Sequence, residues 1–126
     1  MNRESPKRPH EDLSVWQQAM SLVEQVYACS SHYPADERFG LTAQLRRCAI
    51  SVPSNIAEGA ARRSTPEYLH FLSIARGSLS ELDTQLQIAG RLGYGAAPAS
   101  TKACIGEVFA MLTGLMNSLQ AREAAR

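Results

Sequence analysis

Apolar side chains recur every three to four residues along most of this chain, the spacing of one face of an α-helix. The pattern predicts four helices: over about 12–32, from about residue 36 or 37, from 64 or 65 to about 93, and over about 100–120. Four helices with short connections bury their apolar faces most simply as an antiparallel up-and-down bundle. We therefore predict an all-α fold, with residues 1–11 as a flexible arm and residues 12–122 as one four-helix-bundle domain.

One stripe of each predicted helix is expected to face the interior. These stripes are Leu13, Trp16, Met20, Val23 and Tyr27; Leu41, Leu45, Cys48, Ala49, Val52 and Ile56; Tyr68, Phe71, Leu72, Ala75, Leu79, Leu82, Leu86 and Ala89; and Ile105, Val108, Leu112, Leu115, Met116 and Leu119.

Local signals place several of the helix ends. Asp12 is a candidate N-cap, and the carboxylates of Asp36 and Glu37 suit the positive start of the second helix. Ser64 or Thr65, followed by Pro in the first turn, is a strong start signal for the third helix. Gly93 is a natural terminator for that helix.

The segment 51–59 breaks the local rules of a helix, because it places a proline, an asparagine and a carboxylate close to an apolar face. We expect the side chain of Asn55 to satisfy the carbonyls of Ala49 and Ile50, which Pro53 leaves without a partner. Glu58 is expected to pair with an arginine, with Arg76 of the same chain or of a symmetry mate as the candidate. Gly59 and Gly77 are expected to allow close approach of helices.

Two polar stripes flank the apolar faces of the second and third helices, and we predict that they form contacts between subunits. The residues predicted for this role are Ser51, Asn55, Glu58 and Gly59 on the second helix, and Arg76, Ser80, Asp83 and Gln87 on the third.

The 126-residue chain has a formal net charge of only +1, so it does not coat nucleic acid by charge alone. Its charge is nevertheless uneven, because five arginines and one acidic residue lie between positions 38 and 63. Arg46, Arg47, Arg62 and Arg63 are the candidates for contacts with nucleic-acid phosphates. Solvation or salt bridges between subunits are the competing explanations for each arginine.

The remaining composition favours neither a metal site nor catalysis. Cys29, Cys48 and Cys104 lack metal-ligand spacing and indicate free thiols in a reducing compartment. No hydrolase motif occurs, and no cofactor is expected. The N-terminus lacks the apolar stretch of a signal peptide, so we expect a cytoplasmic protein without a membrane anchor.

Several segments carry a resemblance to one protein family. They are Trp16–Met20, Pro34–Gln44, Arg46–Arg47, Ser51–Gly59 and Phe71–Glu81. The chain resembles the bacterial four-helix-bundle family that includes proteins encoded in intervening sequences of 23S ribosomal RNA genes. The resemblance implies a ring-like homopentamer, and kinship with accessory proteins of diversity-generating retroelements, which associate with a reverse transcriptase and with nucleic acid. Those proteins are basic, whereas this chain is nearly neutral.

Two functions follow as expectations. The first is a non-enzymatic homopentamer that binds RNA or another nucleic acid as an accessory factor. The second is an oligomeric scaffold that recruits a protein partner, such as a reverse transcriptase, without nucleic acid. The near-neutral charge favours the second, and the resemblance favours the first.

Overall fold

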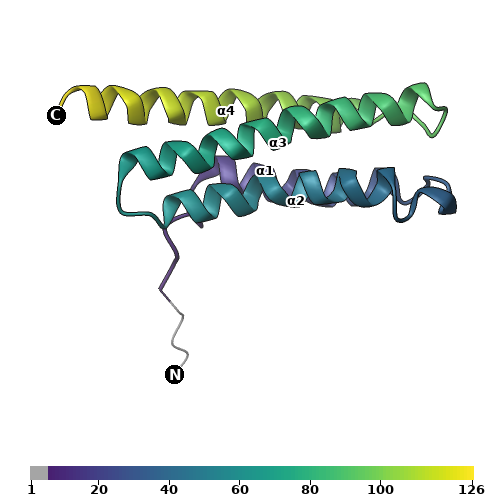
Figure 1. Cartoon of the computed structure of the whole chain (residues 1–126), viewed down its shortest axis with the longest axis horizontal. Helices are drawn as coiled ribbons and strands as arrows, with labels where there is room; N and C mark the ends of the chain where they lie inside the picture. The colour runs from purple at the N-terminus through teal and green to yellow at the C-terminus, as the bar shows by residue number, and fades with distance from the viewer. Residues whose placement is uncertain (1–5) are drawn as a thin grey trace.

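Four α-helices account for most of the computed structural model, which describes residues 6–126 (Figure 1). The helices are α1 (Ser14–Ser30), α2 (Leu41–Ala60), α3 (Thr65–Arg91) and α4 (Ala99–Ala124), with a short 3₁₀ helix, η1 (Ala35–Glu37), before α2. Successive helices run in opposite directions, so the predicted up-and-down arrangement of one protomer is confirmed (Figure 1). The predicted residues 1–5 of the arm lie outside the described part of the chain.

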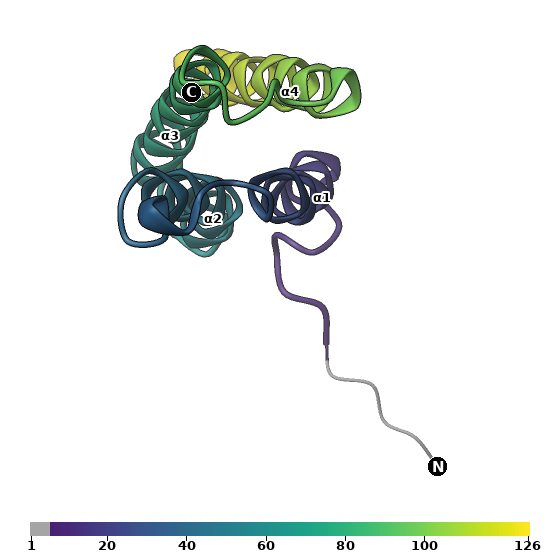
Figure 2. The same cartoon turned by 90° about the vertical axis from the view of Figure 1, so that its right-hand side faces the viewer.

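The helices occupy the four corners of the bundle when it is viewed end-on (Figure 2). Helix α1 packs against α2 and α4, and α3 packs against the same two helices. Across the described residues, the diagonal pairs α1–α3 and α2–α4 make no close backbone contacts. The apolar core therefore lies along the axis, where one stripe from each helix meets the other three.

The interior of the bundle confirms the predicted stripes of α3 and α4 almost completely. Leu72, Leu79, Leu82, Val108 and Leu112 are fully buried, and their neighbours on the same stripes are buried or half-buried. On α2, Leu45, Ala49, Val52 and Ile56 are likewise fully buried. Helix α2 continues through Pro53, which lies buried inside it.

The predicted interior face of α1 is correct only in part, because Leu13, Trp16 and Val23 are half-buried against the core while the fully buried positions are others. The buried residues are Val15, Ala19, Leu22 and Val26, which follow the same spacing as Trp16, Met20, Val23 and Tyr27 but start one residue earlier. One residue turns a helix by about 100°, so α1 carries two apolar stripes side by side. The smaller side chains occupy the interior, while Met20 and Tyr27 remain 44% and 40% exposed.

The helix ends follow the local signals with two corrections. Ser64 is the N-cap of α3, since its hydroxyl accepts a hydrogen bond from the Glu67 amide at 3.3 Å, and Gly93 ends the helix with a φ of 83°. Helix α1 has Leu13 rather than Asp12 at its N-cap position, and the Asp12 carboxylate pairs with Lys7 at 2.9 Å.

The start of α2 is the second correction, because that helix begins at Leu41 and not at Asp36 or Glu37. Glu37 ends η1, and its carboxylate accepts a hydrogen bond from the Leu41 amide at 3.2 Å. The Glu37 carboxylate thus accepts a hydrogen bond from one of the amide groups that have no partner within α2, although Glu37 itself lies outside that helix. Helix α4 extends to Ala124, slightly beyond the predicted end of the bundle at residue 122.

Candidate interaction surfaces

The candidate arginines form two separate groups at opposite ends of α2. Arg46 and Arg47 lie in the first turns of the helix, whereas Arg62 and Arg63 follow its last residue. Sixteen residues of helix correspond to about 24 Å, so the two groups form no single patch on one protomer. Each group therefore has to be considered as a surface of its own.

Arg46 is anchored within its own chain. Its Nε donates to the Ser30 hydroxyl at 2.9 Å, one of its terminal nitrogens donates to the Tyr27 carbonyl at 3.3 Å, and the guanidinium lies 4.4 Å from the centre of the Tyr27 ring. These contacts join α2 to the end of α1. Arg47, one residue later, is exposed and makes no ion pair within the described residues.

The second arginine group lies where α2 ends and α3 begins. Arg62 donates to the Glu58 carboxylate at 2.7 Å and lies 4.7 Å from the centre of the Phe71 ring, while Arg63 is exposed. The predicted partner of Glu58 within the chain is therefore wrong, because the pair forms with Arg62, one turn further along. An exposed pair of this kind contributes little stability.

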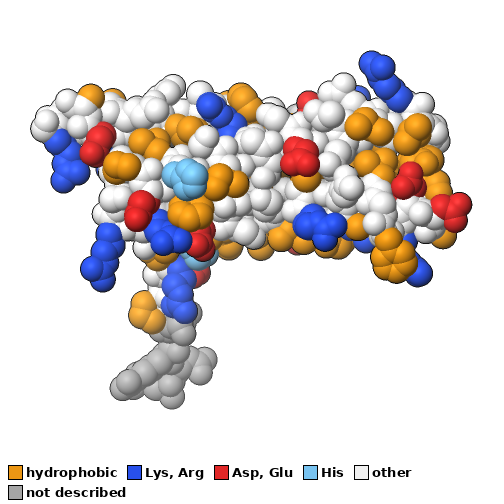
Figure 3. Space-filling view, in the orientation of Figure 1, with side chains coloured by type: hydrophobic (Ala, Val, Ile, Leu, Met, Phe, Trp, Pro, Cys, Tyr) orange, Lys and Arg blue, Asp and Glu red, His pale blue; other side chains and the backbone are white. Residues whose placement is uncertain are grey.

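The C-terminal end of α4 adds two arginines that the sequence reasoning missed. Arg122 and Arg126 line a hollow of about 420 Å³ together with Thr65 and Glu123, and Arg126 donates to the Glu123 carboxylate at 3.4 Å. Figure 3 shows basic side chains projecting from this end of the molecule, with acidic ones between them. Their wide separation in sequence hid the cluster, which forms only because α4 returns to the start of α3.

The polar stripe on α2 makes its contacts within the same protomer, and Ser51 is the member that bonds to the neighbouring helix. The hydroxyls of Ser51 and Ser78 lie 2.8 Å apart, across the seam between α2 and α3. Asn55 donates to the carbonyl and the hydroxyl of Ser51 at 2.8 and 2.9 Å, so its predicted bonds to the carbonyls of Ala49 and Ile50 are wrong. A position at −4 is geometrically favoured for a side chain that bonds back along its own helix.

The predicted stripe on α3 lies toward α4. Arg76 donates to the Thr113 hydroxyl at 3.3 Å and lies 5.7 Å from the centre of the Phe109 ring. Gln87 donates to the Asp83 carboxylate at 3.2 Å, and Ser80 is exposed beside them. Their predicted role between subunits stays a prediction, since these contacts are all internal to one protomer.

The two glycines singled out in the sequence differ in their surroundings. A Cβ built on Gly59 would lie 2.9 Å from the Phe71 Cβ, 3.0 Å from the Tyr68 ring and 3.2 Å from the Tyr68 carbonyl oxygen. The close approach of α2 and α3 at Gly59 is therefore confirmed. A Cβ on Gly77 would meet no atom within 4 Å, so within the protomer this residue brings no helices together.

A shallow apolar groove runs along the outside of α1 and α2. Its central part has a volume of about 350 Å³, and Arg38, Arg46 and Arg47 border its continuation toward the start of α2. We call this surface the α1–α2 groove. It is lined by His10, Trp16, Met20, Val23, Ile50, Pro53, Ser54 and Ala57. The second apolar stripe of α1 forms one wall, which was the signal in the sequence for this surface.

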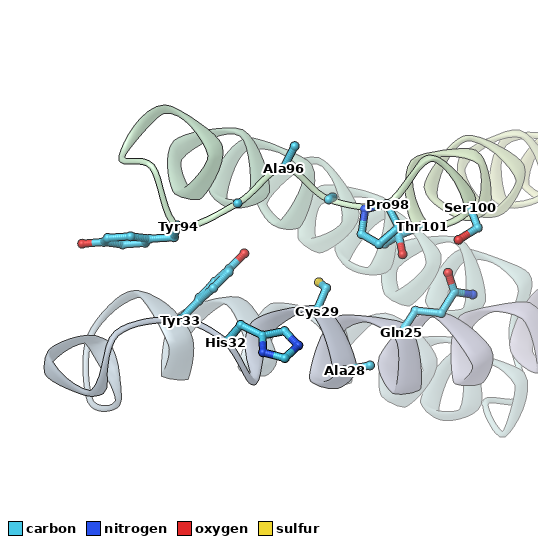
Figure 4. Close-up of a pocket in the computed structure, with 12 residues that line it drawn as sticks. Gln25, Ala28, Cys29, His32, Tyr33, Tyr94, Ala96, Pro98, Ser100 and Thr101 are labelled. Atoms are coloured by element: carbon cyan, nitrogen blue, oxygen red, sulfur yellow. The ribbon is translucent and has the colours of Figure 1, made fainter.

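A cavity of about 580 Å³ lies between the end of α1 and the loop that joins α3 to α4 (Figure 4). Tyr33 and Tyr94 face one another at its mouth, with ring centres 5.9 Å apart, and the Cys29 thiol points into it. Burial raises the pKa of both Cys29 and Tyr33, and a hydrogen bond to Glu37 raises the pKa of Tyr94. These three groups are therefore protonated near neutral pH, and none is an activated nucleophile.

The structure also shows the surroundings of the three cysteines and of the possible metal ligands. Cys48 and Cys104 are buried, Cys29 is half-buried, and all three thiols are free. Within residues 6–126 no cluster of three or more His, Cys, Asp or Glu side chains is close enough to hold a metal ion. No helix among the described residues has the length and apolar character needed to cross a bilayer.

The fold defines the class of the protein, which is a small all-α protein built on one four-helix bundle. Its arginine groups and its α1–α2 groove lie on the outer surface of that bundle. The family model of 23S rRNA-intervening sequence proteins matches residues 11–114, which is most of the bundle. The chain belongs to this family, as the resemblance indicated. Comparison with curated proteins gave no match.

Proposed function

We propose that the chain is a non-enzymatic protein that assembles into a ring of five copies and binds RNA through its phosphate groups. Membership of a family named for intervening sequences of 23S rRNA supports RNA as the ligand. The non-enzymatic part of the proposal is consistent with the cavity beside Cys29, because burial raises the pKa of that thiol and so disfavours the reactive thiolate. The ring itself is an implication of the family resemblance.

The observation that carries the proposal is the arginine cluster at the end of the bundle. Arg62 and Arg63 follow α2, and Arg122 and Arg126 end α4 close to Thr65. Guanidinium groups at an exposed end of the molecule suit contacts with phosphates, which depend on charge more than on a shaped pocket. A ring repeats this cluster five times on one of its faces, so a nearly neutral protomer still presents concentrated positive charge.

RNA binding is tested by fluorescence anisotropy with a labelled RNA stem–loop, at 50 and 200 mM KCl. The triple variant Arg62→Gln, Arg63→Gln and Arg122→Gln should weaken binding at least tenfold at 50 mM KCl. It should also flatten the dependence of log K on log salt by about one unit for each phosphate interaction that the substitutions remove. Arg91→Gln with Lys102→Gln is the control, because both residues are exposed at the opposite end of the bundle.

Light scattering under the same conditions tests the assembly, which should have five times the 13.8 kDa mass of the chain. A monomeric mass at micromolar concentration would refute the ring. Binding that ignores both salt and the triple variant would refute the phosphate contacts.

A scaffold that recruits a protein partner, such as a reverse transcriptase, is the second candidate. The net charge of +1 and the exposed α1–α2 groove favour it. A wild-type ring that gains no RNA at 50 mM KCl would make this candidate the primary one.

A further inference from the structure

Two outer surfaces of the protomer carry aliphatic side chains that have no partner. Eight large hydrophobic side chains are exposed in the described part of the chain. Three are aromatic, Tyr27, Phe39 and Phe109, and each has an arginine guanidinium over its ring. The five aliphatic ones lie on two surfaces only: Met20 and Ile50 in the α1–α2 groove, and Ile74, Ile88 and Leu92 on α3.

The exposed side of α3 has a regular composition. Glu67, Ile74, Glu81 and Ile88 follow one another at intervals of seven residues, which places them along one side of the helix. We call these four residues the α3 outer stripe. Ile74 and Ile88 are about 21 Å apart along the helix, and the acidic residues alternate with them. Gly77 lies beside the stripe, exposed, and leaves room for another backbone to approach closely.

The charges of the two surfaces are opposite. Arg38, Arg46 and Arg47 border the α1–α2 groove, whereas both charged members of the α3 outer stripe are acidic. On the side that displays α3, Figure 3 shows hydrophobic side chains interspersed with both acidic and basic ones, so the opposite charge is confined to Glu67 and Glu81 of the stripe itself. An apolar groove with a basic border is complementary to an apolar stripe with carboxylates.

We infer that the α1–α2 groove of one copy receives the α3 outer stripe of the next copy, so that the subunit contact joins two different surfaces. This inference rests on the assembly proposed above and assigns its interface. Self-pairing of the groove would leave the α3 outer stripe exposed, and self-pairing of the stripe would oppose like charges. Pairing one surface with the other covers Met20, Ile50, Ile74 and Ile88 at once.

The positions of the two surfaces agree with a closed ring. In the end-on view, α3 is the neighbour of α2 on the side away from α1 (Figure 2), so the α1–α2 groove and the α3 outer stripe are on helices that meet at α2. A head-to-tail contact between adjacent sides rotates each copy relative to the last, which lets the assembly close. Opposite sides would instead favour an open filament.

The arrangement also separates the two arginine groups by function. Arg47 borders the subunit contact, where the acidic residues of the neighbouring α3 are its partners. Arg63 and Arg122 lie at the end of the bundle, beside the first turn of α3, whereas Ile74 and Ile88 of the contact lie further along that helix.

Two blocking variants test the inference by light scattering at micromolar concentration. Met20→Glu with Ile50→Glu blocks the groove, and Ile74→Glu with Ile88→Glu blocks the α3 outer stripe. Each variant alone should be monomeric, with helical content unchanged by far-UV circular dichroism, because all four side chains are about 40% exposed. Their equimolar mixture should form a dimer and nothing larger, since each variant retains one intact surface.

Phe109→Glu is the matched control, because Phe109 is equally exposed and belongs to neither surface. This variant should keep the mass of the wild type. A wild-type assembly whose blocked variants stay assembled, or whose mixture stays monomeric, would overturn the inference and assign the groove to a different protein partner. A monomeric wild type would instead refute the proposed ring, so the two failures are distinguishable.

Discussion

Replacement of Gly59 by alanine measures how rigidly α2 and α3 are held together. A new methyl group would lie 2.9 Å from the Phe71 Cβ and 3.2 Å from the Tyr68 carbonyl oxygen. Both atoms are part of α3 or attached directly to its backbone, so no change of rotamer can relieve the contact. The helix itself has to shift, and insertion of a methyl group into such a packed site costs about 2–3 kcal/mol.

The gain in helix propensity opposes this strain. Alanine is favoured over glycine inside a helix by about 1 kcal/mol. We therefore expect Gly59→Ala to lower the free energy of unfolding by about 1–2 kcal/mol. For a chain of this length, each kcal/mol corresponds to roughly 3–5 °C in the melting temperature.

Gly114→Ala is the matched control, because Gly114 lies in the interior of α4 and a Cβ there meets no atom within 4 Å. It should raise the free energy of unfolding by up to about 1 kcal/mol, which is the propensity gain alone. Thermal and urea unfolding followed by far-UV circular dichroism, at equal protein concentrations, compares the two variants. A Gly59→Ala protein as stable as Gly114→Ala would show that α3 shifts freely and would refute the reasoning.

Two further predictions concern polar groups in the helix seams. Ser51→Ala and Ser78→Ala each remove one hydroxyl of the Ser51–Ser78 pair, and each should lower the free energy of unfolding by about 1 kcal/mol. In a double-mutant cycle followed by urea denaturation, the double variant should lose less stability than the sum of the two single losses. Additive losses would mean that the two hydroxyls do not interact. Burial and the nearby Glu81 raise the pKa of Cys48 to about 11, so at pH 8 this thiol should react with a maleimide only after the protein unfolds. The more exposed Cys29 should react first. Mass spectrometry of partly labelled protein identifies the labelled cysteine, and early labelling of Cys48 would contradict its burial.

The sequence alone determined the number of helices, most of their ends and about three quarters of the buried hydrophobic core. Helical periodicity and capping are local, because a stripe or a Ser64-Thr65-Pro66 start depends on residues within one or two turns. The stripes of α3 and α4 carry one clear apolar face each, so only one rotation of the helix about its axis buries them well. The polar candidates on α2 were also identified as unusual from their positions alone.

The tertiary structure decided the remaining features, which depend on how one helix is placed against another. Helix α1 has two apolar stripes with identical spacing, and only the space between α2 and α4 selects the one with smaller side chains. The partners of Ser51, Arg46 and Arg76 lie on other helices, and the axial position of those helices is not encoded in local spacing. The hollow shared by Thr65 and Arg122 likewise exists only because an antiparallel bundle returns the end of α4 to the start of α3.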